Sequence, residues 1–351
     1  MFNKKLKKQV FIQRSIDLAQ QSFGQQSPNP MVGSVITYKN KIIGEGFHQQ
    51  FGTNHAEINA INSIKDPNLL KEASIYVTLE PCFHTGKTPP CVQAIINKEI
   101  KQVNISVKDI NPLTAGQSIQ ILRKRSFSVQ EGLLEKKGTE LIRHFTTNIN
   151  KKRPYILLKY AVSQDGFIGK ENEQIWLSNP FSKRIVHLWR SKFDAILTGG
   201  QTARVDNPRL STRFFSKRDP LRVVLTKSGN FSDKLHLFDH SAPTVIATTN
   251  HQLIQAESHI DIIKLDPTKN YLLELMEGLL AQKNIGTIII EGGKKTLQSF
   301  IDANLWDEAR IIKTPIFLGD GISAPALKNS EFKQKYQLGT DSVLVYRNKE
   351  S

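Results

Sequence analysis

The chain has 351 residues, of which 39% are hydrophobic and 23% are charged. This composition is ordinary for a soluble globular protein, and the length suits two domains better than one. The net charge of +16 suggests nucleic acid as a partner. However, the basic residues form only short clusters, such as Lys4–Lys8 and Arg123–Arg125, and no basic block alternates with aromatic residues. We therefore expect no nucleic-acid partner.

The N-terminal stretch Met1–Val10 is rich in lysine, and no apolar run follows it. The pattern of a signal peptide and the long apolar run of a membrane-spanning helix are both missing from the sequence. These features predict a cytoplasmic protein with no membrane partner.

The first part of the chain alternates predicted helices and strands. A hairpin is expected from Ser34–Tyr38 and Ile42–Phe47, which flank Lys39–Lys41. Further strands are predicted at Ser74–Leu79, Gln102–Val107 and Phe127–Gln130. Helices are predicted at Leu6–Ser22, His55–Ile64, Cys91–Lys98, Ser118–Arg125 and Leu133–Ile149.

The second part begins with a new series of strands after a junction near Asn148–Pro154, which predicts domains at residues 1–150 and 151–351. Helical patterns between the strands favour a mostly parallel sheet with helices on its faces. Ala309–Ile316 and Ser342–Tyr346 are expected to be late antiparallel strands. The other predicted elements are the strands Tyr155–Val162, Ala195–Thr198, Arg222–Leu225, Thr244–Thr248, Ile260–Leu265 and Thr287–Ile290, and the helix Thr296–Ala303.

Three potential metal ligands are spread over the first part of the chain. His55 is followed by Cys82 and Cys91, which are the only two cysteines. One imidazole and two thiolates suit zinc, with a fourth position left for water, and Glu57 is close enough to act on that water. A disulfide is the alternative for any cysteine pair, although it is uncommon without an export signal. A purely structural zinc site would need a fourth protein ligand, which His84 could supply.

The predicted elements also suggest how these ligands meet. His55 and Cys91 are expected near the starts of two helices, and Cys82 on the loop after a strand. All three would then converge at one edge of the sheet, where helix N-termini favour thiolate over thiol.

With these motifs placed, the first part resembles the cytidine deaminase-like domain of bifunctional riboflavin-pathway enzymes. Eight residues separate Cys82 from Cys91, as in that family, whereas nucleic-acid deaminases usually carry Cys-x-x-Cys. The chain departs from the family pattern at Phe83 and Ile110. The segments that carry the resemblance are Pro28–Gly33, Gly44–His48, His55–Glu57, Thr78–Cys82, Gly86–Cys91 and Asp109–Pro112.

This resemblance implies an α/β/α domain that deaminates a phosphorylated pyrimidine with one zinc ion per chain. His55, Cys82 and Cys91 would bind the metal, and Glu57 would be catalytic. Asn29 and His48 resemble residues of the pyrimidine pocket, although Asn29 could simply cap a turn and His48 could lie on the surface. The residues expected near the phosphoribosyl group are His84, Lys87, Asp109 and Asn111, of which the last two could be turn residues only.

The second part resembles the reductase domain of the same enzymes, a dihydrofolate reductase-like α/β fold. Gly292-Gly293 follows a predicted strand and precedes a predicted helix, where backbone N–H groups can hold a pyrophosphate. There is no complete Gly-x-Gly-x-x-Gly, so a Rossmann unit is not indicated. The matching segments are Lys159–Gly166, Trp176–Ser178, Arg190, Ala195–Gly199, Thr202–Leu210, Arg213 and Glu291–Gly293.

This second resemblance implies hydride transfer from NADPH to C1 of the ribosyl group. Lys159 and Glu291 would be catalytic, and Arg190 and Arg213 would hold the substrate phosphate, since a guanidinium binds two oxygens at once. Gln174, Leu210 and Glu291 match further substrate positions. The positions that match cofactor contacts are Ala161, Trp176, Thr202, Asp206, Gly293, Lys294, Lys295, Thr296, Leu297, Gln298 and Ser299.

Several of these assignments have a simpler alternative. Trp176 could be core packing, and Asp206 could cap a turn. Lys159 is harder to explain as structural, because an unpaired ammonium in a buried strand is costly. Lys227, where many relatives carry an aspartate, could help to read the 2′-phosphate of NADPH.

The sequence therefore predicts a bifunctional riboflavin-biosynthesis enzyme, deaminase first and reductase second, that forms a homodimer or homotetramer. The alternative is a tRNA-type base deaminase with a C-terminal binding domain, which the net charge favours and the cysteine spacing opposes. A third alternative is a binding protein that keeps the fold and has lost an activity. The presence of Glu57, Lys159 and Glu291 argues against that.

Overall fold

The computed structural model describes residues 2–83, 89–112, 114–215, 219–229, 231–232, 234–250 and 260–350. Contacts divide the chain into two compact units, Met1–Lys151 and Lys152–Ser351. Each unit is described by itself below. Within the described residues, no helix is both long enough and apolar enough to cross a membrane.

The first unit is built on a five-stranded sheet with the strand order β2-β1-β3-β4-β5. Its strands are β1 (Gly33–Tyr38), β2 (Lys41–Phe47), β3 (Ser74–Leu79), β4 (Gln102–Val107) and β5 (Ser128–Gln130). β1 is antiparallel to β2 and β3, whereas β3, β4 and β5 run parallel to one another. Its helices are α1 (Phe2–Ala19), α2 (Ala56–Asn62), α3 (Cys91–Asn97), α4 (Gln117–Lys124), α5 (Glu135–Leu141) and α6 (Arg143–Lys151).

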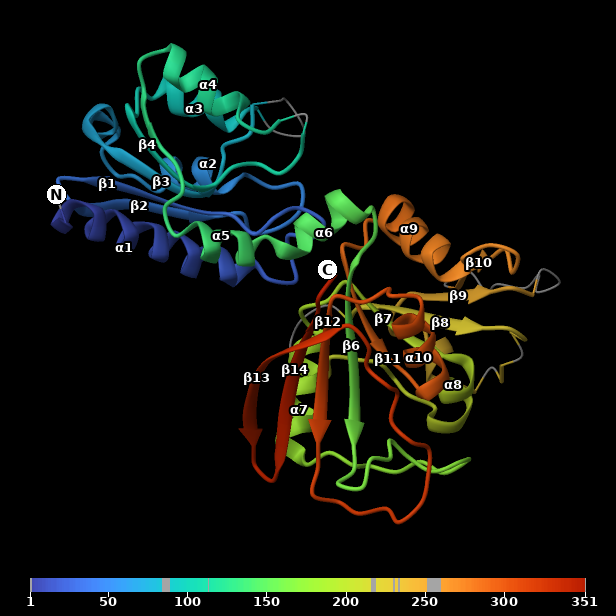
Figure 1. The fold of residues 1–351 in the computed structure, drawn as a ribbon. Coiled ribbons are helices and arrows are strands. Elements are labelled where there is room, and N and C mark those ends of the chain that lie inside the picture. Colours follow the sequence, from blue (N-terminus) through green and yellow to red (C-terminus); the bar gives the residue numbers. More distant parts are fainter. Residues whose placement is uncertain are drawn as a thin grey trace. The chain divides into compact units, whose positions relative to one another are not determined.

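Helices lie on both faces of this sheet (Figure 1), and alternate side chains of each strand point to opposite faces. Val35 and Tyr76 pack with residues of α1 and α5 in one cluster. Their neighbours Ile36, Ile75 and Val77 pack with residues of α2, α3 and α4 in another. The sheet therefore lies between two helical layers, as the resemblance to cytidine deaminases implied.

The helix predicted over Leu133–Ile149 is two helices, α5 and α6, which meet at Ile142. Ile142 is buried against Leu79 and Val107. The interruption is slight, because Ile142 still donates to the carbonyl of Gly138, and Thr146 donates to the carbonyl of Ile142. The helix is interrupted at the buried Ile142, and the sequence pattern did not reveal this interruption.

The second unit is built on a nine-stranded sheet with the order β10-β9-β8-β7-β11-β6-β12-β14-β13. Its strands are β6 (Tyr155–Val162), β7 (Ala195–Gly199), β8 (Leu221–Thr226), β9 (Thr244–Thr248), β10 (Ile260–Lys264), β11 (Thr287–Glu291), β12 (Glu308–Lys313), β13 (Ser330–Leu338) and β14 (Asp341–Asn348). Its helices are α7 (Pro180–Arg190), α8 (Gly200–Asp206), α9 (Tyr271–Lys283) and α10 (Lys294–Asp302). The seven strands from β10 to β12 are parallel, so the predicted mostly parallel sheet is confirmed.

Helices cover both faces of this sheet. Ile156, Leu158 and Tyr160 of β6 share a core with residues of α9 and α10. The intervening side chain of Lys159 points to the opposite face, where it joins a network with Arg190 of α7. β6 therefore contributes to the apolar core on one face and presents a charge on the other.

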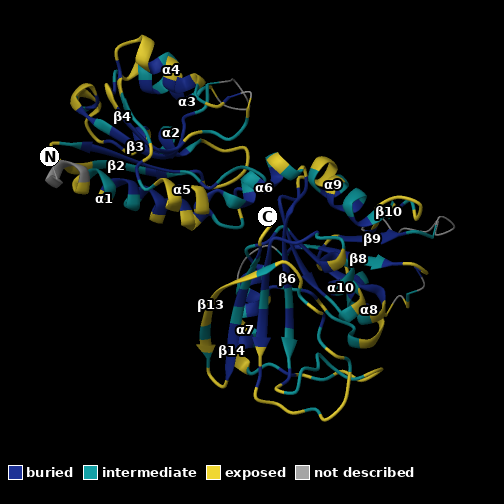
Figure 2. Cartoon of the chain, viewed as in Figure 1, coloured by how far each residue is buried: buried dark blue, intermediate teal, exposed yellow. Residues whose placement is uncertain are grey.

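The C-terminal strands differ in part from the prediction. β12 ends at Lys313, two residues before Pro315, and it is antiparallel to β14 but parallel to β6. β13 was not predicted. Most of its residues are exposed (Figure 2), and Gln334 interrupts the alternation of its apolar residues.

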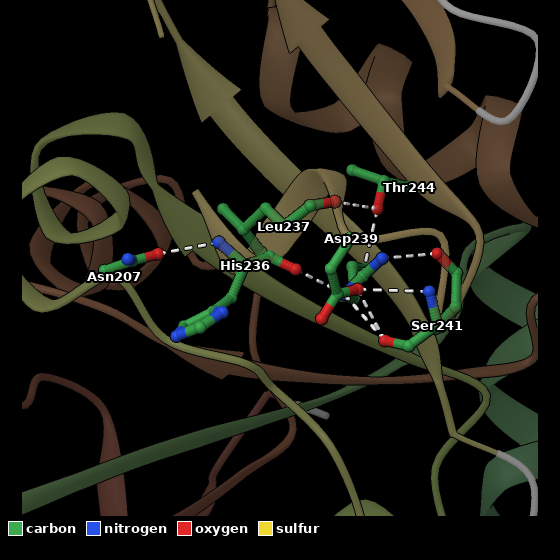
Figure 3. Close-up of polar contacts among 8 residues, drawn as sticks. Asn207, His236, Leu237, Asp239, Ser241 and Thr244 are labelled. Atoms are coloured by element: carbon green, nitrogen blue, oxygen red, sulfur yellow. Dashed lines mark hydrogen bonds and ion pairs between the residues drawn. The ribbon is translucent and has the colours of Figure 1, made fainter. Parts of the chain in front are cut away.

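The connection between β8 and β9 folds around Arg222, whose side chain is 1% exposed. Its guanidinium donates to the carboxylate of Asp239 at 2.9 Å and to the carbonyls of His236 and Ala242. Figure 3 shows the turn that contains His236 and Asp239. The backbone N–H of His236 also donates to the side chain of Asn207 at 2.8 Å, which ties this turn to the segment after α8.

Replacing Arg222 by leucine should destabilise the second unit by about 3 kcal/mol, because two carbonyls and one carboxylate lose their donor. Asp239→Asn is the matched control. It should cost about 1 kcal/mol, because the Asp239 side chain is already 29% exposed.

Urea unfolding followed by tryptophan fluorescence measures this difference in one unit only. All three tryptophans, Trp176, Trp189 and Trp306, lie in the second unit. An Arg222→Leu transition no lower in urea than that of Asp239→Asn would contradict the role given to Arg222.

Candidate functional site

His55, Cys82 and Cys91 form one cluster, and their ligand atoms all lie within 4.8 Å of one another. Nδ1 of His55 lies 3.5 Å from Sγ of Cys82 and 3.3 Å from Sγ of Cys91. In a tetrahedral zinc site, Zn–S bonds of about 2.3 Å and Zn–N bonds of about 2.05 Å separate N from S by roughly 3.6 Å. The three residues therefore fit zinc, and both cysteines are free thiols rather than a disulfide.

Local structure brings these ligands together as the sequence predicted. His55 immediately precedes α2, Cys91 is the first residue of α3, and Cys82 lies three residues after β3. The backbone N–H of Cys91 donates to the sulfur of Cys82 at 3.3 Å. Gly46 allows α2 to approach β2, because a Cβ there would come within 2.3 Å of the backbone nitrogen of Ala60.

The thiols and the nearby carboxyl have altered proton affinities. Hydrogen bonds from the Cys91 thiol and from His55 lower the pKa of the Cys82 thiol. The lowered pKa favours the thiolate, the form that binds metal. Glu57, in the first turn of α2, is 3% exposed, and burial followed by the Cys82 charge raises its pKa to about 7.

Asn29 and His48 lie beside the cluster of His55, Cys82 and Cys91. Nδ2 of Asn29 is 3.0 Å from Nε2 of His48, and Nδ1 of His48 is 3.1 Å from the carbonyl oxygen of Asn54. The ring of His48 meets that of His55 edge-on, with centroids 5.3 Å apart. His48 is therefore buried rather than a surface residue, and burial lowers its pKa.

Asp109 and Asn111 shape their own loop. The carboxylate of Asp109 accepts the backbone N–H of Asn111 at 3.0 Å and the hydroxyl of Thr114 at 2.6 Å. These bonds agree with the simpler prediction of turn residues, at least for Asp109. His84 and Lys87 lie outside the described residues.

Glu80 is a residue that the sequence analysis missed. It is 4% exposed, and its carboxylate accepts the backbone N–H groups of Asp109 at 3.2 Å and Gly116 at 2.8 Å. It thereby holds the backbone at Asp109 and at Gly116. A glutamate at the end of an apolar strand was the signal that could have revealed it.

In the second unit, Glu291 joins two cations. Its carboxylate lies 3.0 Å from Nζ of Lys159 and accepts two hydrogen bonds from Arg190, from Nε at 2.7 Å and from Nη2 at 2.8 Å. Burial alone would raise the pKa of Glu291, but the charges of Arg190 and Lys159 outweigh it and lower the pKa to about 2. Glu291 therefore remains ionised near neutral pH.

A cavity of about 1,720 Å³ opens beside this network. Most of the residues predicted to contact cofactor or substrate line it. They are Lys159, Ala161, Gln174, Trp176, Arg190, Thr202, Asp206, Leu210, Arg213, Glu291, Gly293, Lys294, Lys295, Thr296 and Ser299.

Leu297 and Gln298, which were expected to contact cofactor, do not line this cavity. Leu297 is fully buried in the core, and the side chain of Gln298 bonds to Asp302 and to the backbone N–H of Ala326. A helix turns through about 100° per residue, so only one face of α10 meets the cavity.

The start of α10 fits a phosphate-bearing cofactor. The backbone N–H of Gly293 donates to the hydroxyl of Thr202 at 2.9 Å, which joins the starts of α8 and α10. A Cβ on Gly199 would lie 2.3 Å from the hydroxyl of Thr296, so a larger residue at 199 would force the Thr296 side chain to move. Lys294 and Lys295 add positive charge at this end of the cavity.

One of the simpler alternatives in this unit, core packing of Trp176, is not supported. Trp176 is 63% exposed at the cavity, with Nζ of Lys183 4.8 Å from its ring centre, so it is not core packing. Asp206 lies near Gln174, whose side chain donates to the Asp206 carbonyl at 3.0 Å. Burial raises the pKa of Asp206.

Comparison with known proteins matches both units to families. A family described as the cytidine and deoxycytidylate deaminase zinc-binding region matches residues 5–107. A family described as the RibD C-terminal domain matches residues 154–348. The riboflavin biosynthesis protein RibD of Bacillus amyloliquefaciens is 34% identical over 96% of this chain and 95% of its own length. RibD of Escherichia coli is 30% identical over 89% of this chain and 88% of its own length.

Solved structures agree over nearly the whole chain. The diaminohydroxyphosphoribosylaminopyrimidine deaminase/5-amino-6-(5-phosphoribosylamino)uracil reductase of Thermotoga maritima superposes with a TM-score of 0.90 at 30% identity, covering 98% of this chain and 99% of that one. RibD of Acinetobacter baumannii has a TM-score of 0.87 at 28% identity, with the same coverage.

These matches cover both predicted functions in the predicted order. The cofactors are zinc for the deaminase domain, where the histidine–cysteine cluster fits it, and NADPH for the reductase domain. The chain belongs to the RibD family of riboflavin biosynthesis proteins, and it is an enzyme with a deaminase domain followed by a reductase domain.

Proposed function

We propose that this enzyme deaminates 2,5-diamino-6-ribosylamino-4(3H)-pyrimidinone 5′-phosphate and then reduces its ribosyl group to ribityl. The observation that carries this proposal is the presence of two complete reaction centres in one chain. One is a zinc-type cluster beside the buried Glu57, and the other is a lysine–glutamate–arginine network inside a large cavity.

In the first centre, His55, Cys82 and Cys91 would hold zinc, which would supply the Lewis acidity that makes a water molecule nucleophilic near neutral pH. Glu57 would carry one proton of that water to the ring nitrogen as the water oxygen bonds to the ring carbon. It would then carry the second proton, from the new C–OH group, to the amino group, so that the C–N bond breaks and ammonia leaves. Asn29 and His48 hold the pyrimidine, and Asp109 with Asn111 shapes the loop near the phosphoribosyl group.

In the second centre, the chemistry that bound NADPH would supply is a hydride for C1 of the ribosyl group. The bond from C1 to the ring oxygen would break as C1 gains the hydride, and that oxygen would need a proton. Glu291 is ionised and has no proton to donate, whereas Lys159 carries an ammonium 3.0 Å from it. We assign the proton transfer to Lys159, with Glu291 as the carboxylate that orients it.

Arg190 and Arg213, the two predicted phosphate ligands, have different roles in the cavity. Arg190 donates hydrogen bonds from Nε and Nη2 to Glu291. This edge of its guanidinium is therefore not available to bind the substrate phosphate in the same two-bond manner. Arg213 also lines the cavity and is exposed. We therefore propose Arg213 as the main phosphate ligand and Arg190 as a support of the catalytic carboxylate.

The substrate is a small molecule, and the alternative of a tRNA-type deaminase loses support because a cavity-forming reductase domain occupies the second unit. We propose a homo-oligomer, as expected from the resemblance, without assigning an interface. The cytoplasmic location stays a prediction from the sequence.

His55→Ala should lower the zinc content from about one ion per chain to a small fraction, because one of three protein ligands is lost. Metal analysis of the purified protein measures this. Glu57→Gln is the control and should keep its zinc, since Glu57 is not a ligand. Full zinc content in the His55→Ala protein would remove His55 from the metal site.

Glu57→Gln should reduce deamination by about 10²–10⁴-fold, because the amide cannot carry a proton between water and substrate. The same protein should still reduce substrate that has already been deaminated. Ammonia release and NADPH oxidation, measured separately, give the two rates. Deamination at the wild-type rate would show that Glu57 has another role.

Lys159→Ala should reduce NADPH oxidation by about 100-fold or more, since the proposed proton donor is lost. Deamination should continue, so the deaminated, unreduced compound should accumulate and be visible by mass spectrometry. Lys159→Arg is the matched control, because it keeps the charge but is a poor proton donor. Normal reduction by the alanine protein would exclude Lys159 from the mechanism.

A further inference from the structure

His187 is a buried side chain in the reductase cavity to which nothing above assigns a function. It lies on α7, one turn before Arg190, and is 2% exposed. It lines the cavity, and its ring packs edge-on against Phe214 with centroids 4.6 Å apart. It is therefore held next to the Lys159–Glu291–Arg190 network.

The hydrogen bonding of His187 defines its tautomer. Its Nδ1 lies 2.7 Å from the carbonyl oxygen of Ser211. A carbonyl oxygen can only accept, so Nδ1 carries the proton, and Nε2 of the neutral ring is an acceptor. Among the described residues, the ring makes its hydrogen bond through Nδ1, and Nε2 makes none.

The ring remains neutral under ordinary conditions. Burial, followed by the positive charge of Arg190, lowers the pKa of His187 to about 4. The charge of Arg213 acts in the same direction, and the bond to Ser211 only partly offsets these effects. Nε2 therefore keeps its lone pair at neutral pH.

Nε2 of His187 differs from the carboxylate beside it, because the oxygens of Glu291 already accept hydrogen bonds from Lys159 and Arg190. Lys159, Arg190 and Arg213 donate hydrogen bonds and suit the phosphate or other anionic oxygens of a ligand. The oxygens of an ionised phosphate only accept, so they do not complement Nε2. A hydroxyl group complements it, because a hydroxyl can donate its hydrogen to the lone pair.

We propose that His187 is a specificity-determining residue of the reductase, whose Nε2 accepts a hydrogen bond from a ribosyl hydroxyl of the substrate. This inference rests on the proposed function, because that function supplies a ribosyl substrate to this cavity. Through Nδ1, the same ring holds Ser211, which lies between the two predicted substrate residues Leu210 and Arg213.

The first test uses the wild-type protein and substrate that is already deaminated. Analogues that lack the 2′- or the 3′-hydroxyl are compared with the parent compound in NADPH oxidation. Loss of the hydroxyl that His187 binds should lower kcat/KM on the order of tenfold, as expected for one hydrogen bond. Equal kcat/KM for the parent and both analogues would overturn the proposal.

The second test compares two substitutions that each mimic one ring nitrogen. In His187→Asn, the amide can still donate to Ser211 but nothing replaces Nε2. In His187→Gln, the side-chain oxygen can reach the position of Nε2. The asparagine protein should lose the discrimination between parent and deoxy substrate, whereas the glutamine protein should keep most of it.

A purely structural role for His187 predicts a different result. The asparagine protein would then resemble the wild type, or it would lose activity equally on the parent and deoxy substrates. Either result would overturn the proposal. NADPH binding, measured by fluorescence, should be unchanged, and His187→Leu gives the same comparison if the asparagine protein does not fold.

Controls separate this inference from the proposed function. His240→Asn changes an exposed histidine that does not line the cavity, and it should leave the discrimination intact. If the wild-type protein does not reduce the parent compound at all, the proposed function fails. If it does and the analogues show no difference, only the role of His187 fails.

Discussion

Parallel pairing of neighbouring strands is the constraint on which both sites depend. In the first unit, Leu79 of β3 pairs with Val107 of β4, so the residues that follow both strands emerge at the same edge. Cys82 and Asp109 therefore lie at that edge. In the second unit, Lys159 of β6 pairs with Glu291 of β11. A register shift of one residue would turn one of these two side chains to the opposite face of the sheet.

The buried charges of the second site depend on this strand register. An ionised carboxylate is tolerated in a protein interior only when it is paired and hydrogen-bonded. Glu291 meets this condition with Lys159 and Arg190, and the result is a carboxylate that stays ionised and an ammonium that is held in place. The two ion pairs that stabilise Glu291 also keep it ionised, so the proton for the reaction would come from Lys159 and not from Glu291.

The local elements of the fold could be predicted from the sequence, because most of them carry a clear pattern. The strands Ser74–Leu79, Gln102–Val107, Tyr155–Val162 and Thr244–Thr248 have the bounds expected. β13 was missed because most of this edge strand is exposed and Gln334 interrupts its apolar alternation. The expected late antiparallel strands are confirmed as the pair β12 and β14. The parallel pairing of β12 with β6 was not foreseen, since β6 lies about 150 residues earlier in the sequence.

In the candidate site too, local patterns could be predicted and contacts between residues distant in sequence could not. Motif spacing indicated the zinc ligands and the cavity residues, because those residues recur in fixed local patterns. The bond from Arg190 to Glu291 joins residues 101 positions apart, so no local pattern could reveal that the guanidinium is engaged. Glu80 and His187 were missed for a related reason: their partners, Gly116 and Ser211, are backbone groups on distant loops.

The central claim is that one chain performs a deamination and then a reduction. The most direct measurement is to incubate the purified protein with 2,5-diamino-6-ribosylamino-4(3H)-pyrimidinone 5′-phosphate, with and without NADPH, and to identify the products by mass spectrometry. The account predicts a deaminated, unreduced product without NADPH, and a deaminated ribityl product with it. An unchanged substrate in both reactions, or reduction without deamination, would contradict the account.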